Sequence, residues 1–188
     1  MSSLSVKTEQ TDRRELDRLL LAMGAGDREA LAYLYEEVRG AVYAAALGVL
    51  GNHHAAQDVT QDAFVRLWEA APGYRSQGSP MAWILTVTRN LALTALRKEG
   101  REEELSPEAW EAIPVGEDPE GAEDRLVLEA AMEALDGTER QIILLHAVSG
   151  LKHRDIAALL GLPLSTVLSK YNRGLKKMKK QLEGEEHP

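Results

Sequence analysis

The chain has 188 residues, of which 44% are hydrophobic and only 5% aromatic, a composition that suits one or two small helical domains rather than a large enzyme. It contains no cysteine, which excludes disulfides and thiolate metal sites. The polar first residues lack the apolar segment of a signal peptide, and no run of about 18 apolar residues suggests a membrane span. The sequence therefore predicts a soluble, cytoplasmic protein without membrane insertion.

The formal net charge of -8 is distributed unevenly. Residues 1–100 hold 11 basic and 12 acidic side chains, residues 101–124 hold 1 basic and 10 acidic, and residues 125–188 hold 10 basic and 8 acidic. Within residues 164–182 there are 6 basic side chains and no acidic one. Because the acidity is concentrated in one central stretch, the net charge does not exclude a nucleic-acid partner.

The first hundred residues show helical periodicity. We predict an opening helix near residues 12–23, a second that begins after an N-cap at Asp27 and ends at the turn around Gly51, and a third after that turn. The apolar residues expected to face the core are Leu31, Leu34, Val38, Val42, Ala45 and Val49 in the second helix, and Val59, Ala63 and Leu67 in the third.

A fourth helix is expected over residues 80–98, and its polar side is unusual. The helix would bury Trp83 or Ile84, together with Val87, Leu91 and Ala95. Its polar residues include no acid; they are Thr86, Arg89, Asn90, Arg97 and Lys98. A turn-rich loop with Tyr74 and Arg75 precedes it. A loop followed by a basic helix is a suitable platform for a nucleic-acid strand, with a pocket for an unstacked base. Taken alone, an Arg/Asn pair is more often ordinary surface.

Residues 101–122 are expected to form a linker between two helical units. They contain three of the seven prolines, they are strongly acidic, and they show no sustained apolar period. Such a segment is either a solvated, self-repelling tether or a polyanion that competes with nucleic acid for a nearby basic surface.

The strongest signal is a helix-turn-helix pattern at residues 153–172. Ala157 permits close packing of the first helix, Gly161 accepts the left-handed turn, and Val167 faces back into the core. Ser165 is expected to cap the second helix, whose buried stripe is predicted to be Val167, Tyr171, Leu175 and Met178.

The rest of that second helix is predicted to contact DNA. In this motif its first turns enter the major groove, so we expect the early polar residues at base edges and the later lysines at phosphates. A lysine-rich helix end stabilised by the helix dipole would explain the last lysines, but not the turn pattern. The early residues are Ser165, Thr166, Ser169, Lys170 and Arg173, and the lysines are Lys176, Lys177, Lys179 and Lys180.

Catalytic and metal sites are not expected. His153-Arg154-Asp155 imitates a kinase catalytic loop, but no Asn follows at the required spacing and no Gly-rich loop precedes it. The histidines lack a consistent helical spacing to carboxylate partners, so ordinary surface or cap roles are favoured over a metal site. The sequence predicts a protein that is not an enzyme and has no cofactor.

Both halves of the chain resemble, in the same order, the extracytoplasmic-function sigma factors, which are promoter-recognition subunits of bacterial RNA polymerase. The resemblance covers residues 12–183 and rests on AAQDVTQDAFVRLWEA, YRSQGSPMAWILTVTRNLALTALRK and LDGTERQIILLHAVSGLKHRDIAALLGLPLSTVLSKYNRGLKKMKKQL. It implies an all-α protein with two small helical domains. The expected units are a disordered tail at 1–11, region 2 at 12–100, the acidic linker at 101–122, the region 4 helix-turn-helix at 123–183 and a tail at 184–188.

The resemblance also implies roles for individual residues. The polymerase clamp would be bound by Asp58, Gln61, Asp62 and Arg66. The minus-10 promoter element would be recognised and melted by Tyr74, Arg75, Gln77, Arg89, Asn90, Arg97 and Lys98. The minus-35 element would be recognised by Ser165, Thr166, Ser169, Lys170, Arg173, Lys176 and Lys177. The implied partners are core RNA polymerase, promoter DNA and an anti-sigma factor, with a monomeric chain when these are absent.

Two positions depart from the family pattern. Leu168 stands where a basic residue usually follows the valine, and Pro80-Met81 stand where an aromatic and a basic residue are common. Two other functions are compatible with parts of the sequence. A sigma-like decoy would bind polymerase or an anti-sigma protein without opening promoters, and a helix-turn-helix repressor would leave the first hundred residues without a role.

Overall fold

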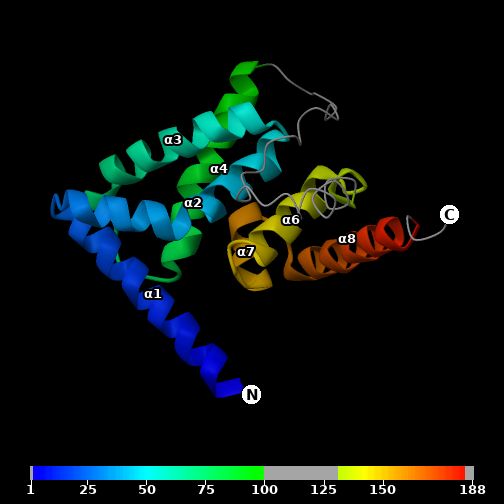
Figure 1. The fold of residues 1–188 in the computed structure, drawn as a ribbon, viewed down its shortest axis with the longest axis horizontal. Coiled ribbons are helices and arrows are strands. Elements are labelled where there is room, and N and C mark those ends of the chain that lie inside the picture. Colours follow the sequence, from blue (N-terminus) through cyan, green and yellow to red (C-terminus); the bar gives the residue numbers. More distant parts are fainter. Residues whose placement is uncertain (1, 100–130, 185–188) are drawn as a thin grey trace, which may run out of the picture.

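The computed structural model describes residues 2–99 and 131–184, and the regular elements in these two ranges are all helices (Figure 1). The all-α prediction is confirmed. The predicted linker at 101–122 lies outside the described residues. The elements are α1 (Ser2–Gly24), α2 (Arg28–Leu50), α3 (His53–Ala70), the short 3-10 helix η1 (Ala71–Gly73), α4 (Pro80–Glu99), α6 (Gly137–Ala147), α7 (His153–Leu160) and α8 (Leu164–Gly184).

Helix α1 starts at Ser2, well before the expected start near residue 12. The next two helices begin and end as local rules predict. The side chain of Asp27 accepts hydrogen bonds from the backbone N–H groups of Glu29 and Ala30, at 2.9 and 3.3 Å. Gly51 ends α2 in the left-handed conformation, with φ of 64°. The predicted cap and turn are therefore confirmed.

Helices α1 to α4 pack around one apolar core. Its fully buried members include Leu20, Leu34 and Leu67, each of which contributes about 1.5–3 kcal/mol by leaving water. The sequence did not decide whether Trp83 or Ile84 is the buried residue of α4, and the structure shows that it is Ile84. The buried stripe of α4 is Ile84, Leu85, Thr88 and Ala92, while the expected Val87, Leu91 and Ala95 are partly buried.

The C-terminal helices form the expected helix-turn-helix. Ala157 and Val167 are buried, and Gly161 ends α7 with φ of 66°. The prediction that Ser165 caps the second helix is wrong. Helix α8 already begins at Leu164, and the carbonyl of Pro163 accepts hydrogen bonds from the backbone N–H groups at positions 166 and 167. The side chain of Ser165 is thus exposed and available to a ligand.

Leu175 was expected in the buried stripe of α8, and this is also wrong, since its side chain is 41% exposed. Gly174 is buried instead. A Cβ at this position would lie 2.7 Å from Cδ1 of Ile143, so any side chain here would force Ile143 to move if α8 is to stay this close to α6. Because Gly174 faces α6, the next residue, Leu175, lies about 100° further round the helix, on its flank.

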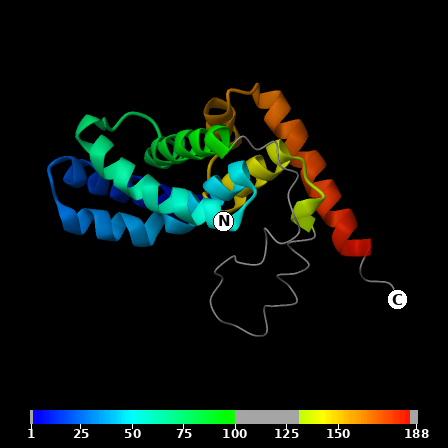
Figure 2. The same ribbon diagram turned by 90° about the horizontal axis from the view of Figure 1, so that it is seen from above.

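The two helical units pack directly against each other (Figure 2). Helix α2 lies against α6, and α4 lies against α7, while α8 is on the side of α6 away from α1 to α3. One apolar cluster runs through both units and joins Leu85 of α4 to Leu145 and Ile156 of the C-terminal helices. The sequence left the arrangement of the two units open, and the structure shows a closed one.

Candidate nucleic-acid interface

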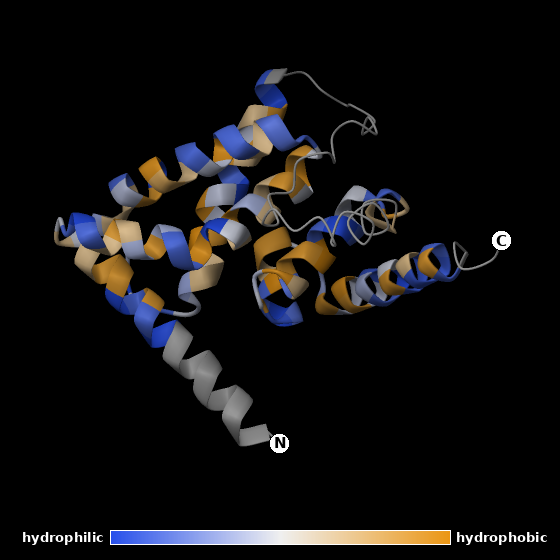
Figure 3. Cartoon of the chain, viewed as in Figure 1, coloured by the Kyte–Doolittle hydropathy of each residue, from blue (hydrophilic) through white to orange (hydrophobic). Residues whose placement is uncertain are grey.

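The outer face of α8 is polar and open. Ser165, Ser169, Asn172, Arg173 and Lys176 are exposed on it. Figure 3 shows hydrophilic and hydrophobic residues alternating along α8, as expected for a helix with one side on a core. The exposed hydroxyl and amide groups lie in the first turns, and the cations follow. This order suits a recognition helix that reaches base edges at its N-terminal end.

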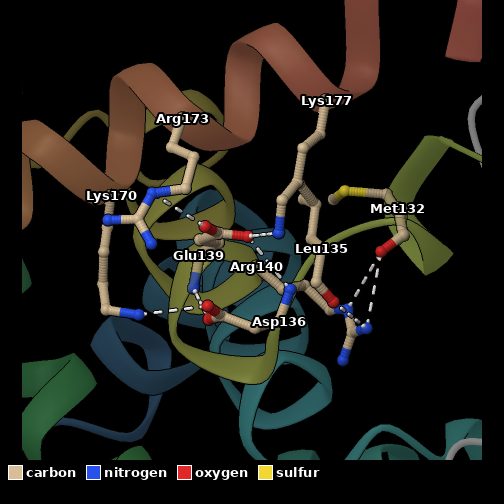
Figure 4. Close-up of polar contacts among 8 residues, drawn as sticks. All are labelled: Met132, Leu135, Asp136, Glu139, Arg140, Lys170, Arg173 and Lys177. Carbon is tan, nitrogen blue, oxygen red and sulfur yellow. Dashed lines mark hydrogen bonds and ion pairs between the residues drawn. The ribbon is translucent and has the colours of Figure 1, made fainter. Parts of the chain in front are cut away.

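Three of the predicted DNA contacts, Lys170, Arg173 and Lys177, reach acidic side chains at the start of α6 (Figure 4). The ammonium of Lys170 donates a hydrogen bond to Oδ2 of Asp136 over 3.1 Å. The ammonium of Lys177 donates to Oε2 of Glu139 over 2.7 Å, and Nε of Arg173 lies 3.7 Å from the other oxygen of that carboxylate. Lys170 and Lys177 therefore lie beside α6, on the flank of the outer face.

Asp136 and Glu139 also begin helix α6. Asp136 caps it by accepting the backbone N–H of Glu139, and the carboxylate of Glu139 accepts the backbone N–H of Asp136. Burial alone would raise the pKa of Asp136, but the cap hydrogen bond and the ammonium of Lys170 outweigh it, so this pKa lies below its ordinary value. The same two acids thus fix the start of α6 and hold α8.

Neither acid was predicted as a site residue. The spacing of Asp136 and Glu139 is readable as a capping box, but their contacts with α8 cross more than thirty residues of sequence. The neighbouring Arg140 is buried and donates hydrogen bonds to the carbonyls of Met132 and Leu135. This arginine holds the turn that leads into α6.

Helix α4 exposes the second candidate surface. Thr86, Asn90, Thr94, Arg97 and Lys98 are exposed at helical spacings that place them on neighbouring positions of one side. Arg75 and Gln77 are exposed on the loop before α4. The structure thus brings five of the seven residues predicted for minus-10 recognition to the surface. The other two are Tyr74, which is buried, and Arg89, which is partly buried.

Tyr74 does not point outward. Its side chain is 3% exposed, its hydroxyl donates a hydrogen bond to Asp17 of α1, and its ring meets Trp83 edge-on with 4.9 Å between centroids. Burial, followed by the hydrogen bond to Asp17, raises the pKa of Tyr74 well above its usual range. In this arrangement Tyr74 holds the loop against α1 and presents no face for a base.

Arg89 lies at the contact between the two units. It lines a small cavity together with Leu85 of α4 and residues of α2, α6 and α7, including Gln141 and Leu159. Its Nε is buried and has no hydrogen-bond partner among the described residues. The predicted neighbours Arg89 and Asn90 therefore face different surroundings, one inside the closed contact and one outside it.

The third surface is the outer side of α3. The predicted polymerase contacts Asp58, Gln61, Asp62 and Arg66 are all exposed there, and Arg66 pairs with Glu69 at 3.0 Å. Val65 lies between them and is 61% exposed. A stripe with acids, an amide and an exposed valine fits a protein partner better than a nucleic acid.

No helix among residues 2–99 and 131–184 is long and apolar enough to cross a membrane.

The family models match both units. Residues 34–102 match sigma-70 region 2, and residues 125–178 match sigma-70 region 4.

Curated relatives carry the same assignment. The chain is 34% identical to ECF RNA polymerase sigma factor SigE of Mycolicibacterium smegmatis over 167 residues, which span 84% of this chain and 64% of that protein. It is 28% identical to ECF RNA polymerase sigma factor SigK of Mycolicibacterium vanbaalenii, with 89% of each chain covered.

Two solved structures have a similar fold. The sigma factor RpoE of Bartonella quintana, in complex with the anti-sigma factor NepR, superposes with a TM-score of 0.66 and 25% identity over 81% of this chain and 96% of that one. CnrH, in complex with the cytosolic domain of CnrY, has a TM-score of 0.64 and 22% identity over 90% and 98%. Because both sigma-70 regions match and the curated relatives are ECF RNA polymerase sigma factors, the chain belongs to the extracytoplasmic-function sigma factors.

Proposed function

We propose that this chain is a working promoter-recognition subunit that binds bacterial core RNA polymerase and directs it to minus-35 and minus-10 elements. The observation that carries the proposal is a pair of outward polar faces on separate units, one over residues 86–98 of α4 and one over residues 165–176 of α8. Neither stretch holds an acidic residue. Two such faces suit two promoter elements, whereas a repressor would need only the second. The chain does no chemistry on nucleotides and acts in the cytoplasm, where its polymerase works.

The residue roles follow from exposure and pairing. On α8, Ser165, Thr166 and Ser169 would contact base edges and Lys176 a phosphate. Arg173 and Lys177 reach DNA only by leaving Glu139, and Lys170 only by leaving Asp136. On α4, Asn90, Arg97 and Lys98 would contact the minus-10 strand, with Arg75 and Gln77 beside them. Arg89 and Tyr74 join them only when the contacts that now hold these side chains open.

The outer side of α3 is the proposed polymerase contact, through Asp58, Gln61, Asp62 and Arg66. An anti-sigma factor is a further proposed partner, since the similar RpoE structure contains one. A partner that holds the two units in their closed arrangement would keep Arg89 away from DNA.

Run-off transcription with purified core polymerase and a library of promoter fragments tests the proposal. The intact chain is compared with Asn90→Ala and with Gln181→Ala, a control at an exposed position near the end of α8. We expect specific transcripts from the intact chain and the control, and at least a tenfold loss with Asn90→Ala. Polymerase binding without any transcript would overturn the proposal in favour of a decoy.

A further inference from the structure

The recognition helix carries exposed leucines that its core contacts do not explain. Leu164, Leu168, Leu175 and Leu182 are 43%, 40%, 41% and 40% exposed. The contact of α8 with the rest of its unit is made by other residues, among them the fully buried Val167. Since a helix turns by about 100° per residue, Leu168 lies on the flank of α8 next to Val167 and beside the polar outer face.

Leu168 differs from Leu175 and Leu182 in its position along the helix. It lies in the second turn, within the part of α8 that carries the exposed hydroxyl groups of Ser165 and Ser169. The other two leucines lie two and four turns further on, among the lysines. Only Leu168 and Leu164 are therefore placed where a recognition helix meets base edges.

A leucine at this place has few possible partners on DNA. It has no donor or acceptor, so contact with a phosphate or a polar base edge would strip water from that group without replacing its hydrogen bonds. The apolar group that the major groove offers is the C5-methyl of thymine. The flanking serines and Arg173 would meanwhile supply hydrogen bonds to neighbouring bases and the backbone.

We propose that Leu168 is a specificity residue that contacts the methyl group of one thymine in the minus-35 element. The proposal rests on the proposed function and adds the base, thymine, that one position of α8 selects. A protein partner on the leucine flank is the competing explanation. In that case Leu175 and Leu182, with nearly the same exposure, would matter as much as Leu168.

The test uses the full chain assembled with core polymerase. A bound promoter is first selected from random sequence, and each thymine of its minus-35 region is then replaced singly by deoxyuridine, which lacks only the methyl group. Affinity is measured for the unchanged chain, Leu168→Ala and the control Leu175→Ala. We expect one replacement to weaken binding about fourfold for the unchanged chain and the control, the value for one buried methyl group, and to have no effect with Leu168→Ala.

A second variant examines the same contact from the opposite direction. Leu168→Arg should lose the sensitivity to deoxyuridine and make the logarithmic salt slope of binding steeper by about 0.9, because it adds one phosphate contact. Leu168→Ala and Leu168→Arg both change an exposed side chain, so both variants are expected to fold.

Three results would overturn the inference. The first is a minus-35 region in which every thymine tolerates deoxyuridine. The second is a sensitivity that persists unchanged in Leu168→Ala. The third is weaker polymerase assembly with Leu168→Ala and Leu175→Ala alike, which would assign the leucine flank to a protein partner. A holoenzyme that selects no promoter sequence at all would instead overturn the proposed function itself, and this inference with it.

Discussion

The ammonium of Lys177 lies 2.7 Å from a carboxylate oxygen of Glu139, a side chain that is completely buried between α6 and α8. A buried carboxylate is stable only while its partners remain, because it has lost its hydration. Lys177 is thereby a structural residue of the contact between α6 and α8 as well as a candidate DNA contact.

Replacing Lys177 should therefore cost more stability than replacing its neighbour. We expect Lys177→Met, which keeps the apolar stem, to lower the free energy of unfolding by about 1–3 kcal/mol. The exposed Lys176 is the matched control, and Lys176→Met should change the value by less than about 0.5 kcal/mol. Urea denaturation followed by circular dichroism measures both. Equal losses in the two variants would show that the buried pair contributes nothing.

His153 should make the C-terminal unit sensitive to pH. Burial, and then the neighbouring His146 ring at 4.3 Å between centroids, lowers the pKa of His153 below 6.5, and the ring also packs against Tyr171. Below pH 6.5, the imidazole of residue 153 binds a proton more readily in the unfolded chain than in the folded one. The stabilisation is therefore present above pH 6.5 and is lost as the pH falls toward the lowered pKa.

Melting temperatures measured between about pH 7.5 and pH 5.5 check this expectation. The melting temperature of the unchanged chain should fall as the pH is lowered across this range, and that of His153→Phe, which keeps an aromatic ring in the stack, should fall less. His54→Gln, at an exposed position of α3, should behave like the unchanged chain. The explanation fails if His153→Phe and the unchanged chain show the same pH profile.

The closed arrangement should open when a charge is placed beside Arg89. Leu159 and Arg89 line the same cavity between the units, so Leu159→Lys would put two cations into one poorly solvated space. A compact chain of 188 residues has a radius of gyration of about 16 Å, and X-ray scattering should find a value several ångström larger for the variant than for the unchanged chain. Leu164→Lys, at an exposed position, is the control. A radius unchanged by Leu159→Lys would contradict the closed contact.

Gly174 should not tolerate a methyl group. A Cβ there would lie 2.7 Å from Ile143, so we expect Gly174→Ala to lower the free energy of unfolding by about 1–3 kcal/mol. Gly40 also lies within a helix, but a Cβ there meets nothing within 4 Å. Gly40→Ala should therefore raise the stability by about 0.5–1 kcal/mol. Opposite signs in the two denaturation midpoints are the expected result, and a loss in both would contradict the packing explanation.

The features read correctly from the sequence are those that a few neighbouring residues decide. The cap at Asp27 needs only the next backbone N–H groups, and the turn at Gly161 needs only a residue that tolerates positive φ. Ser165 failed as a cap because the helix already begins before it, with the carbonyl of Pro163 accepting the backbone N–H groups of Thr166 and Val167. A local capping rule can therefore fail when a backbone carbonyl two residues away accepts the N–H groups first.

The sequence by itself determined the helical class, the two units and the family, because periodicity, turn residues and motif order are properties of the chain alone. Only the tertiary structure decided which candidate residues are free. Tyr74 is bound to Asp17, Lys177 to Glu139, and Arg89 lies in the contact between the units. Each of these partners comes from a helix distant in sequence, and no short-range pattern encodes which helix will lie beside which.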